Sequence, residues 1–146
     1  MGATDPISVV RDNFDAWTAG DWERFRASTA ADVVSIEPSS GREVHGADEA
    51  VALASGWKGA FPDGNAEITN IFASGDQVCA ELTYTGTNTG EMSGPMGTMP
   101  ATGRRATLRA CAVARVQDGK ITSFTNYFDM MGLMAQLGLM PEGQPA

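Results

Sequence analysis

The chain has 146 residues, hydrophobic residues at 42% of positions and a formal net charge of −8 at pH 7. This length predicts a single domain over 1–146, with a core over about 7–138 and a polar tail over 139–146. The acidic balance argues against nucleic acid, which needs a basic stripe, and against a polybasic membrane contact. It favours a neutral or weakly polar small ligand.

Cysteine and histidine content restricts the metal and redox chemistry. Cys79 and Cys111 fit neither a zinc spacing nor a disulfide framework, and His45, the single histidine, excludes a site with several histidine ligands. Residues 1–6 lack the basic start and apolar run of a signal peptide, and no segment has the roughly 18 apolar residues of a membrane span. We therefore expect a cytoplasmic protein with no metal site and no membrane partner.

The first half of the chain is predicted to be mainly helical. Apolar residues at helical spacing, and the caps Asp21 and Gly46, indicate helices. The predicted elements are a helix over 7–19, a helix over 22–28, a short strand over 31–38 and a helix over about 46–60.

The second half is predicted to consist mainly of strands. The predicted strands span 66–73, 77–86, 104–117 and 120–129, and a short helix follows over 130–137. A loop over 87–103 is long enough to be functional, with Met99 and its neighbouring methionines either a lid over a pocket or core filler. Three helices followed by an antiparallel sheet indicate an α+β fold.

The Asp118-Gly119 turn predicts how the last two strands pair. A two-residue turn places Gln117 opposite Lys120, and alternation then separates the residues into two faces. One predicted face is apolar and holds Ala80, Leu82, Tyr84, Leu108, Ala110, Ala112, Tyr127 and Asp129. The other holds Cys79, Glu81, Arg109, Cys111, Phe124, Asn126 and Phe128. A slip of one residue in the last strand would exchange its two sets.

The many alanines of the apolar face leave room that either a packed helix or a pocket could fill, and Phe14, Trp17 and Trp57 are candidate walls of such a pocket. Asp129 at its edge has two interpretations. Burial would raise its pKa and make it a stronger base, or it caps the helix that starts at Met130.

Three further polar side chains have open interpretations. Glu37 is either a second carboxylate in the pocket or an exposed strand end. Tyr84 and Tyr127 are either hydrogen-bond donors to a developing enolate or ordinary residues of a half-buried sheet.

Several motifs resemble the SnoaL-like polyketide cyclases of the nuclear-transport-factor-2-like superfamily. They are the run from Asp118 to Asp129 with 130–138 after it, Gly86-Thr87-Asn88-Thr89-Gly90 with 100–103, Ala19-Gly20-Asp21-Trp22 and Val44-His45-Gly46. The resemblance implies a curved antiparallel sheet wrapped by three helices into a cone with a deep pocket. It also implies an Asp at position 129 as acid/base, no cofactor, and homodimerisation through the outer sheet face.

Some positions depart from relatives. Asn88, a candidate substrate-binding residue, stands where many cyclases have a histidine. The Arg and Asp of limonene-epoxide hydrolases fall on Leu82 and Tyr84, which argues against that hydrolysis. We therefore expect a cofactor-independent cyclase or isomerase acting by aldol-type acid–base catalysis on a polyketide-like carbonyl compound, a small hydrophobic or aromatic substrate. The alternatives are a non-catalytic small-molecule binding protein and, third, epoxide opening or hydration by Glu37 with Asp129.

Overall fold

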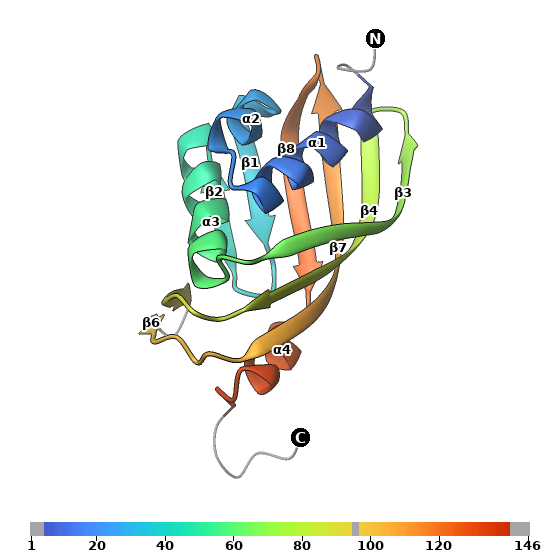
Figure 1. Ribbon diagram of the computed structural model, residues 1–146. Coiled ribbons are helices and arrows are strands. Elements are labelled where there is room, and N and C mark those ends of the chain that lie inside the picture. Colours follow the sequence, from blue (N-terminus) through green and yellow to red (C-terminus); the bar gives the residue numbers. More distant parts are fainter. Residues whose placement is uncertain (1–4, 95–96, 141–146) are drawn as a thin grey trace.

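In the computed structural model, which describes residues 5–94 and 97–140, a curved six-stranded sheet carries helices on its concave side (Figure 1). The strands lie in the order β2-β1-β8-β7-β4-β3, and β5 and β6 form a separate hairpin. The helices are α1 (Pro6–Ala19), α2 (Trp22–Ala27), α3 (Ala47–Ala60) and α4 (Met130–Gln136). The strands are β1 (Thr29–Glu37), β2 (Arg42–His45), β3 (Asn65–Ser74), β4 (Gln77–Thr87), β5 (Met92–Gly94), β6 (Gly97–Met99), β7 (Arg105–Gln117) and β8 (Lys120–Phe128).

This architecture confirms the α+β class and the curved sheet, with two corrections. Strand β1 pairs in parallel with β8, so the sheet is mixed and not wholly antiparallel. Parallel pairing is possible because most of the chain separates these two strands, far more than the dozen residues that a crossover needs. Strand β2 and the β5–β6 hairpin are additional elements that the sequence pattern did not predict.

Helix α1 begins and ends where its capping residues require. The Asp5 side chain accepts a hydrogen bond from the Ser8 backbone N–H, and Gly20 closes the helix with a φ of 70°, a left-handed conformation that suits glycine. Figure 1 shows α1 crossing the concave face of the sheet, where it buries Val10 and Phe14. The helix therefore forms one wall of the space that the curved sheet encloses.

The β7–β8 hairpin contains a bulge that decides which side chains face this space. Its turn is the expected two-residue turn, in which Asp118 and Gly119 both have positive φ, and Gln117 faces Lys120. Val116 then faces Ile121, but Arg115 faces Ser123. Thr122 is therefore an extra residue, and from Ser123 onward the strand is shifted by one position.

This shift makes the predicted faces of the last strand wrong. Asn126 lies opposite Ala112, on the face that packs towards the helices, whereas Tyr127 lies opposite Cys111 and is 52% exposed. In the pairing of β4 with β7, Leu82 lies opposite Ala110, and both belong to the predicted apolar face. The predicted faces of these two strands are therefore correct.

Two apolar clusters make up the core. The larger one packs α1 against the sheet and includes Val10, Phe14, Val33 and Leu82. The smaller one lies near α4 and comprises the buried residues Ala60, Phe61, Met92, Ala106, Leu133 and Leu137. In the described part of the chain, none of the helices is long and apolar enough to cross a membrane.

Candidate active-site pocket

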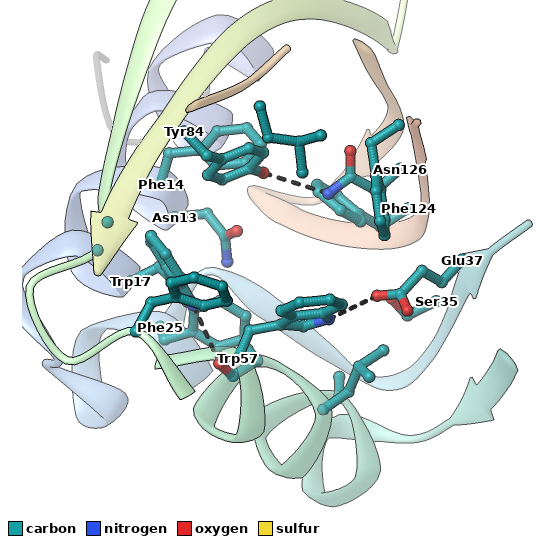
Figure 2. A pocket seen from close by; sticks show the side chains of 18 of the residues that line it. Asn13, Phe14, Trp17, Phe25, Ser35, Glu37, Trp57, Tyr84, Phe124 and Asn126 are labelled. Carbon is teal, nitrogen blue, oxygen red and sulfur yellow. Dashed lines mark hydrogen bonds between the residues drawn. The ribbon is translucent and has the colours of Figure 1, made fainter. Parts of the chain in front are cut away.

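A cavity of about 140 Å³ lies between the concave face of the sheet and helices α1 and α3. That volume is roughly ten times the space that one water molecule needs. Its walls are mainly aromatic, and its polar side chains are few (Figure 2). The aromatic lining consists of Phe14, Trp17, Phe25, Trp57, Phe61, Tyr84, Phe124 and Phe128. The other polar side chains are Asn13, Thr29, Ser35, Glu37, Thr85 and Asn126.

Glu37, at the end of β1, is the carboxylate that lines this cavity. It is only 4% exposed, and its charge is balanced by Arg42, whose Nη2 lies 2.9 Å from Oε1. The Ser40 hydroxyl donates to the same oxygen at 2.7 Å. The indole of Trp57 donates to Oε2 at 2.8 Å, which leaves Oε2 with room for a further donor (Figure 2). This arrangement keeps a carboxylate at the edge of an apolar space.

Tyr84 and Asn126 form a second polar group in the cavity (Figure 2). Tyr84 comes from β4 and Asn126 from β8, so they reach each other over β7, whose Ala110 and Ala112 leave room for the tyrosine ring. The Asn126 side-chain amide donates to the Tyr84 hydroxyl at 3.2 Å. Burial, with a smaller effect of the negative Glu37, raises the pKa of Tyr84 well above its ordinary value, so the phenol stays protonated at neutral pH.

The structure brings five of the predicted site residues to this cavity: Phe14, Trp17, Glu37, Trp57 and Tyr84. Trp17 packs edge-on to Tyr84 with ring centroids 5.6 Å apart, and its indole donates to the Ala54 carbonyl at 3.0 Å. Asn126 also lines the cavity, although the sequence pairing placed it on the other face. The bulge at Thr122 explains this difference, and no residue type in the hairpin marks it in advance.

Asp129 lies outside the cavity lining, contrary to its predicted position. It is exposed, and its Oδ1 accepts a hydrogen bond of 2.9 Å from the Gly132 backbone N–H. It is therefore the N-cap of α4, which is the second of the two interpretations of this residue. The shift at Thr122 is again the reason, because it turns positions 127 and 129 away from the helices.

Asn88 has a structural position and does not line the cavity. Its side chain is fully buried, and its amide nitrogen donates to the carbonyls of Ala60 and Gly90 at 3.1 and 2.9 Å. Its Oδ1 accepts from both the backbone N–H and the hydroxyl of Thr102 at 2.9 Å. Asn88 therefore joins the start of the long loop to its end and to the end of α3.

Tyr127 and Met99 also lie away from the cavity lining. Tyr127 is on the outer face of the sheet, and Met99 packs against the smaller core cluster beside Met92. These two methionines therefore fill space in the core, which is the second of the two interpretations of the loop methionines.

The outer face of the sheet carries an apolar patch with a pair of thiols. Phe72 and Val113 flank Cys79 in the strand pairing and are 55% and 37% exposed. The sulfur atoms of Cys79 and Cys111 lie 3.5 Å apart as free thiols. Within residues 5–94 and 97–140, no three His, Cys, Asp or Glu side chains gather in a way that would hold a metal ion.

Comparisons with known proteins agree with this geometry. A sequence profile of SnoaL-like polyketide cyclases matches residues 7–137. A search of curated protein sequences gave no match.

Solved structures show the same fold. IdmH, a candidate polyketide cyclase from Streptomyces antibioticus, is 26% identical, with a TM-score of 0.78 over 92% of this chain and 99% of its own. AclR, a candidate hydroxylase from Streptomyces galilaeus, is 26% identical, with a TM-score of 0.79 over 96% of this chain and 85% of its own. An LEH-like epoxide hydrolase from M. tuberculosis, at 22% identity, has a TM-score of 0.71 over 92% of this chain and 90% of its own. From the profile match over most of its length, the chain belongs to the SnoaL-like polyketide cyclase family.

Proposed function

We propose that this protein is a cofactor-independent cyclase or isomerase that acts on a polyketide-like carbonyl compound by acid–base catalysis. The observation that carries the proposal is that a buried carboxylate, Glu37, and a protonated phenol, Tyr84, line the same aromatic cavity. The family and the similarity to IdmH, described as a candidate polyketide cyclase, support this reaction class.

The chemistry assigns one task to each group. Oε2 of Glu37 removes a proton from the carbon next to a carbonyl, and the Tyr84 hydroxyl donates a hydrogen bond to the carbonyl oxygen as negative charge develops there. The carbanion then attacks a second carbonyl of the same molecule, which forms the new carbon–carbon bond. The proton held by Glu37 passes to the resulting alkoxide. The aromatic walls hold the chain folded for this attack, which supplies much of the rate.

Glu37 replaces Asp129 as the proposed base because only Glu37 lines the cavity. The two carboxylates give a direct test with Glu37→Gln and Asp129→Asn. Conversion of linear poly-β-ketone compounds, followed by chromatography and mass spectrometry, is the readout. We expect Glu37→Gln to lower kcat by at least about 100-fold with an unchanged circular dichroism spectrum. Asp129→Asn should keep kcat within a few-fold of the unmodified protein.

The opposite pattern, with conversion lost in Asp129→Asn and kept in Glu37→Gln, would show that Asp129 is the base, as the resemblance implies.

A non-catalytic binding protein is the second candidate, and four hydrogen bonds to Glu37 favour it by occupying much of that carboxylate. In that case the same compounds bind without conversion. Epoxide opening by Glu37 with Asp129 has no support, since Asp129 does not line the cavity.

We also propose that two copies associate through the outer sheet face, in a reducing cytoplasm that keeps both thiols free. The exposed apolar side chains of Phe72, Val113 and Tyr127 support this interface. Light scattering after size exclusion tests it, since Phe72→Glu should convert a dimer into a monomer, while Ala52→Glu, at an exposed position of helix α3 away from this face, should not. A monomeric unmodified protein would exclude the dimer.

A further inference from the structure

The cavity contains one buried polar atom that has no partner. Among the described residues, Oδ1 of Asn126 is the only buried side-chain oxygen or nitrogen without a hydrogen bond. Buried acceptors are nearly always satisfied in native proteins, and an unsatisfied one costs stability. Asn126 lines the cavity, so its unpaired oxygen lies beside the space that a ligand would fill. The unpaired oxygen therefore points to a ligand that carries a hydrogen-bond donor.

The neighbouring Tyr84 supplies the complementary group. Its hydroxyl oxygen already accepts from the Asn126 amide nitrogen at 3.2 Å, so its own hydrogen is free to be donated. The pair thus offers a ligand one donor, the Tyr84 hydrogen, and one acceptor, the Asn126 oxygen. If the oxygen and nitrogen of the Asn126 amide are exchanged, Tyr84 donates to the amide oxygen instead. The Tyr84 oxygen is then free to accept and the amide nitrogen is free to donate, so the pair still offers one donor and one acceptor.

A hydroxyl group is the ligand function that matches one donor and one acceptor at the same place. A ketone or a methyl ether has no hydrogen to donate and satisfies half of the pair. A carboxylate also lacks a donor, and its charge would meet both the Asn126 oxygen and the negative Glu37 that lines the same cavity. We infer that Tyr84 and Asn126 form a subsite for a neutral ligand hydroxyl, that of an enol or a phenol.

This inference deepens the proposed function and rests on it only for the nature of the reaction. A carbonyl that enolises at the pair gains a hydrogen bond to Asn126 that the ketone cannot make. The site therefore binds the enol more tightly than the ketone, which favours proton removal by Glu37. A phenol, the product type of an aromatising cyclisation, fits the pair in the same way.

Binding of matched probes tests the subsite without any turnover. Isothermal titration calorimetry compares 2-naphthol with 2-methoxynaphthalene, and benzoylacetone, which is largely enolised, with its O-methyl enol ether. The unmodified protein should bind each hydroxyl compound about tenfold more tightly than its methyl ether. A preference in the naphthalene pair alone assigns the subsite to phenols, and one in the diketone pair alone assigns it to enols.

Two variants and a control identify the residues responsible. Asn126→Leu keeps the size of the side chain and removes the acceptor, so the preference should fall below about threefold. Tyr84→Phe removes the donor and should have the same effect, which gives a second test if one variant does not fold. Ser35→Ala changes another polar residue of the same cavity and should leave the preference intact.

Equal affinity for both members of each pair, no measurable binding of either hydroxyl compound, or an unchanged preference in both variants would overturn the subsite. Failure of the proposed reaction looks different. In that case no poly-β-ketone compound is converted by the unmodified protein, whereas the hydroxyl preference persists there and in Glu37→Gln.

Discussion

The indole nitrogen of Trp57 donates to Oε2 of Glu37 across 2.8 Å, so the side chain of α3 fixes the carboxylate at the end of β1. Arg42, on β2, completes the arrangement, since its guanidinium pairs with Glu37 and lies 5.8 Å from the centre of the Trp57 ring. Glu37 is held from two directions by neighbours in separate elements. Its position therefore depends on the packing of α3 against the sheet.

Replacing Trp57 with Phe should destabilise the protein by about 1–3 kcal/mol. The phenylalanine keeps an aromatic ring against Phe61 and Phe128 but removes a donor from the buried Glu37. Urea denaturation measures the change. Trp22→Phe, in a half-buried tryptophan that packs edge-on against Phe25, is the matched control and should cost less. Equal losses in the two variants would contradict this assignment.

Asn88 should be among the positions least tolerant of substitution. Asn88→Ala removes its hydrogen bonds to Ala60, Gly90 and Thr102, for an expected loss of about 2–4 kcal/mol. Asn88→Asp should cost still more, because it turns a carboxylate oxygen towards two carbonyls. Thermal and urea unfolding check the order, with Asn65→Asp on the exposed part of β3 as control. An Asp variant more stable than the Ala variant would refute it.

Asp63 should give the stability a pH-dependent component. Its carboxylate accepts from the Thr87 backbone N–H at 2.7 Å, and this bond holds the pKa of Asp63 below its ordinary value of 3.8. A lowered pKa stabilises the folded state above the unfolded pKa, and the effect is lost as pH falls through the folded pKa.

Asp63→Asn should therefore be less stable than the unmodified protein at neutral pH, and the difference should begin to shrink near pH 3.8 and vanish below the lower pKa of the folded state. Denaturation at a series of pH values measures it, and Asp32→Asn at an exposed position serves as control. A difference that stays constant down to acid pH would exclude this origin.

The Cys79 thiol should react slowly with alkylating reagents. Burial and the neighbouring Cys111 raise the pKa of Cys79, which lowers the thiolate fraction at neutral pH. Iodoacetamide labelling followed by mass spectrometry should show slower modification than for a free model thiol. Cys111→Ala removes the contribution of Cys111 to the raised pKa of Cys79 and should speed up the labelling of Cys79. Faster labelling in the unmodified protein than in this variant would count against the interpretation.

Local signals in the sequence predict the elements well. Capping residues and turns such as Asp118-Gly119 place the boundaries of the helices and of β3, β4, β7 and β8 within one or two residues of those observed. Helix spacing also predicts the three walls Phe14, Trp17 and Trp57, and one of the two open interpretations of Glu37 places it in the cavity. Strand alternation puts Phe124 and Phe128, which line the cavity, on the outer face. The family resemblance adds the curved sheet that brings them together.

The pairing of strands that are distant in sequence, and the bulge in β8, could not be predicted from such local signals. The parallel pairing of β1 with β8 joins residues far apart in the chain, and nothing in either strand specifies it. Strict alternation puts Asn126 on the wrong face and Asp129 in the cavity, because it treats the hairpin as regular through Thr122. A bulge depends on how the strands twist against their neighbours, which a count of residues does not capture.

Thr122, the extra residue of the bulge, determines which side chains of β8 face the cavity and which face outward. Deleting it would turn Tyr127 and Asp129 inward and carry Asn126 outward, without altering the identity of any other side chain. Two relatives that differ in length by one residue in this hairpin can therefore have the same strand sequence and still turn different sets of side chains towards a ligand. Alignments of such chains should be anchored on the paired strands, so that a gap falls at the bulge and not inside the ligand-facing segment.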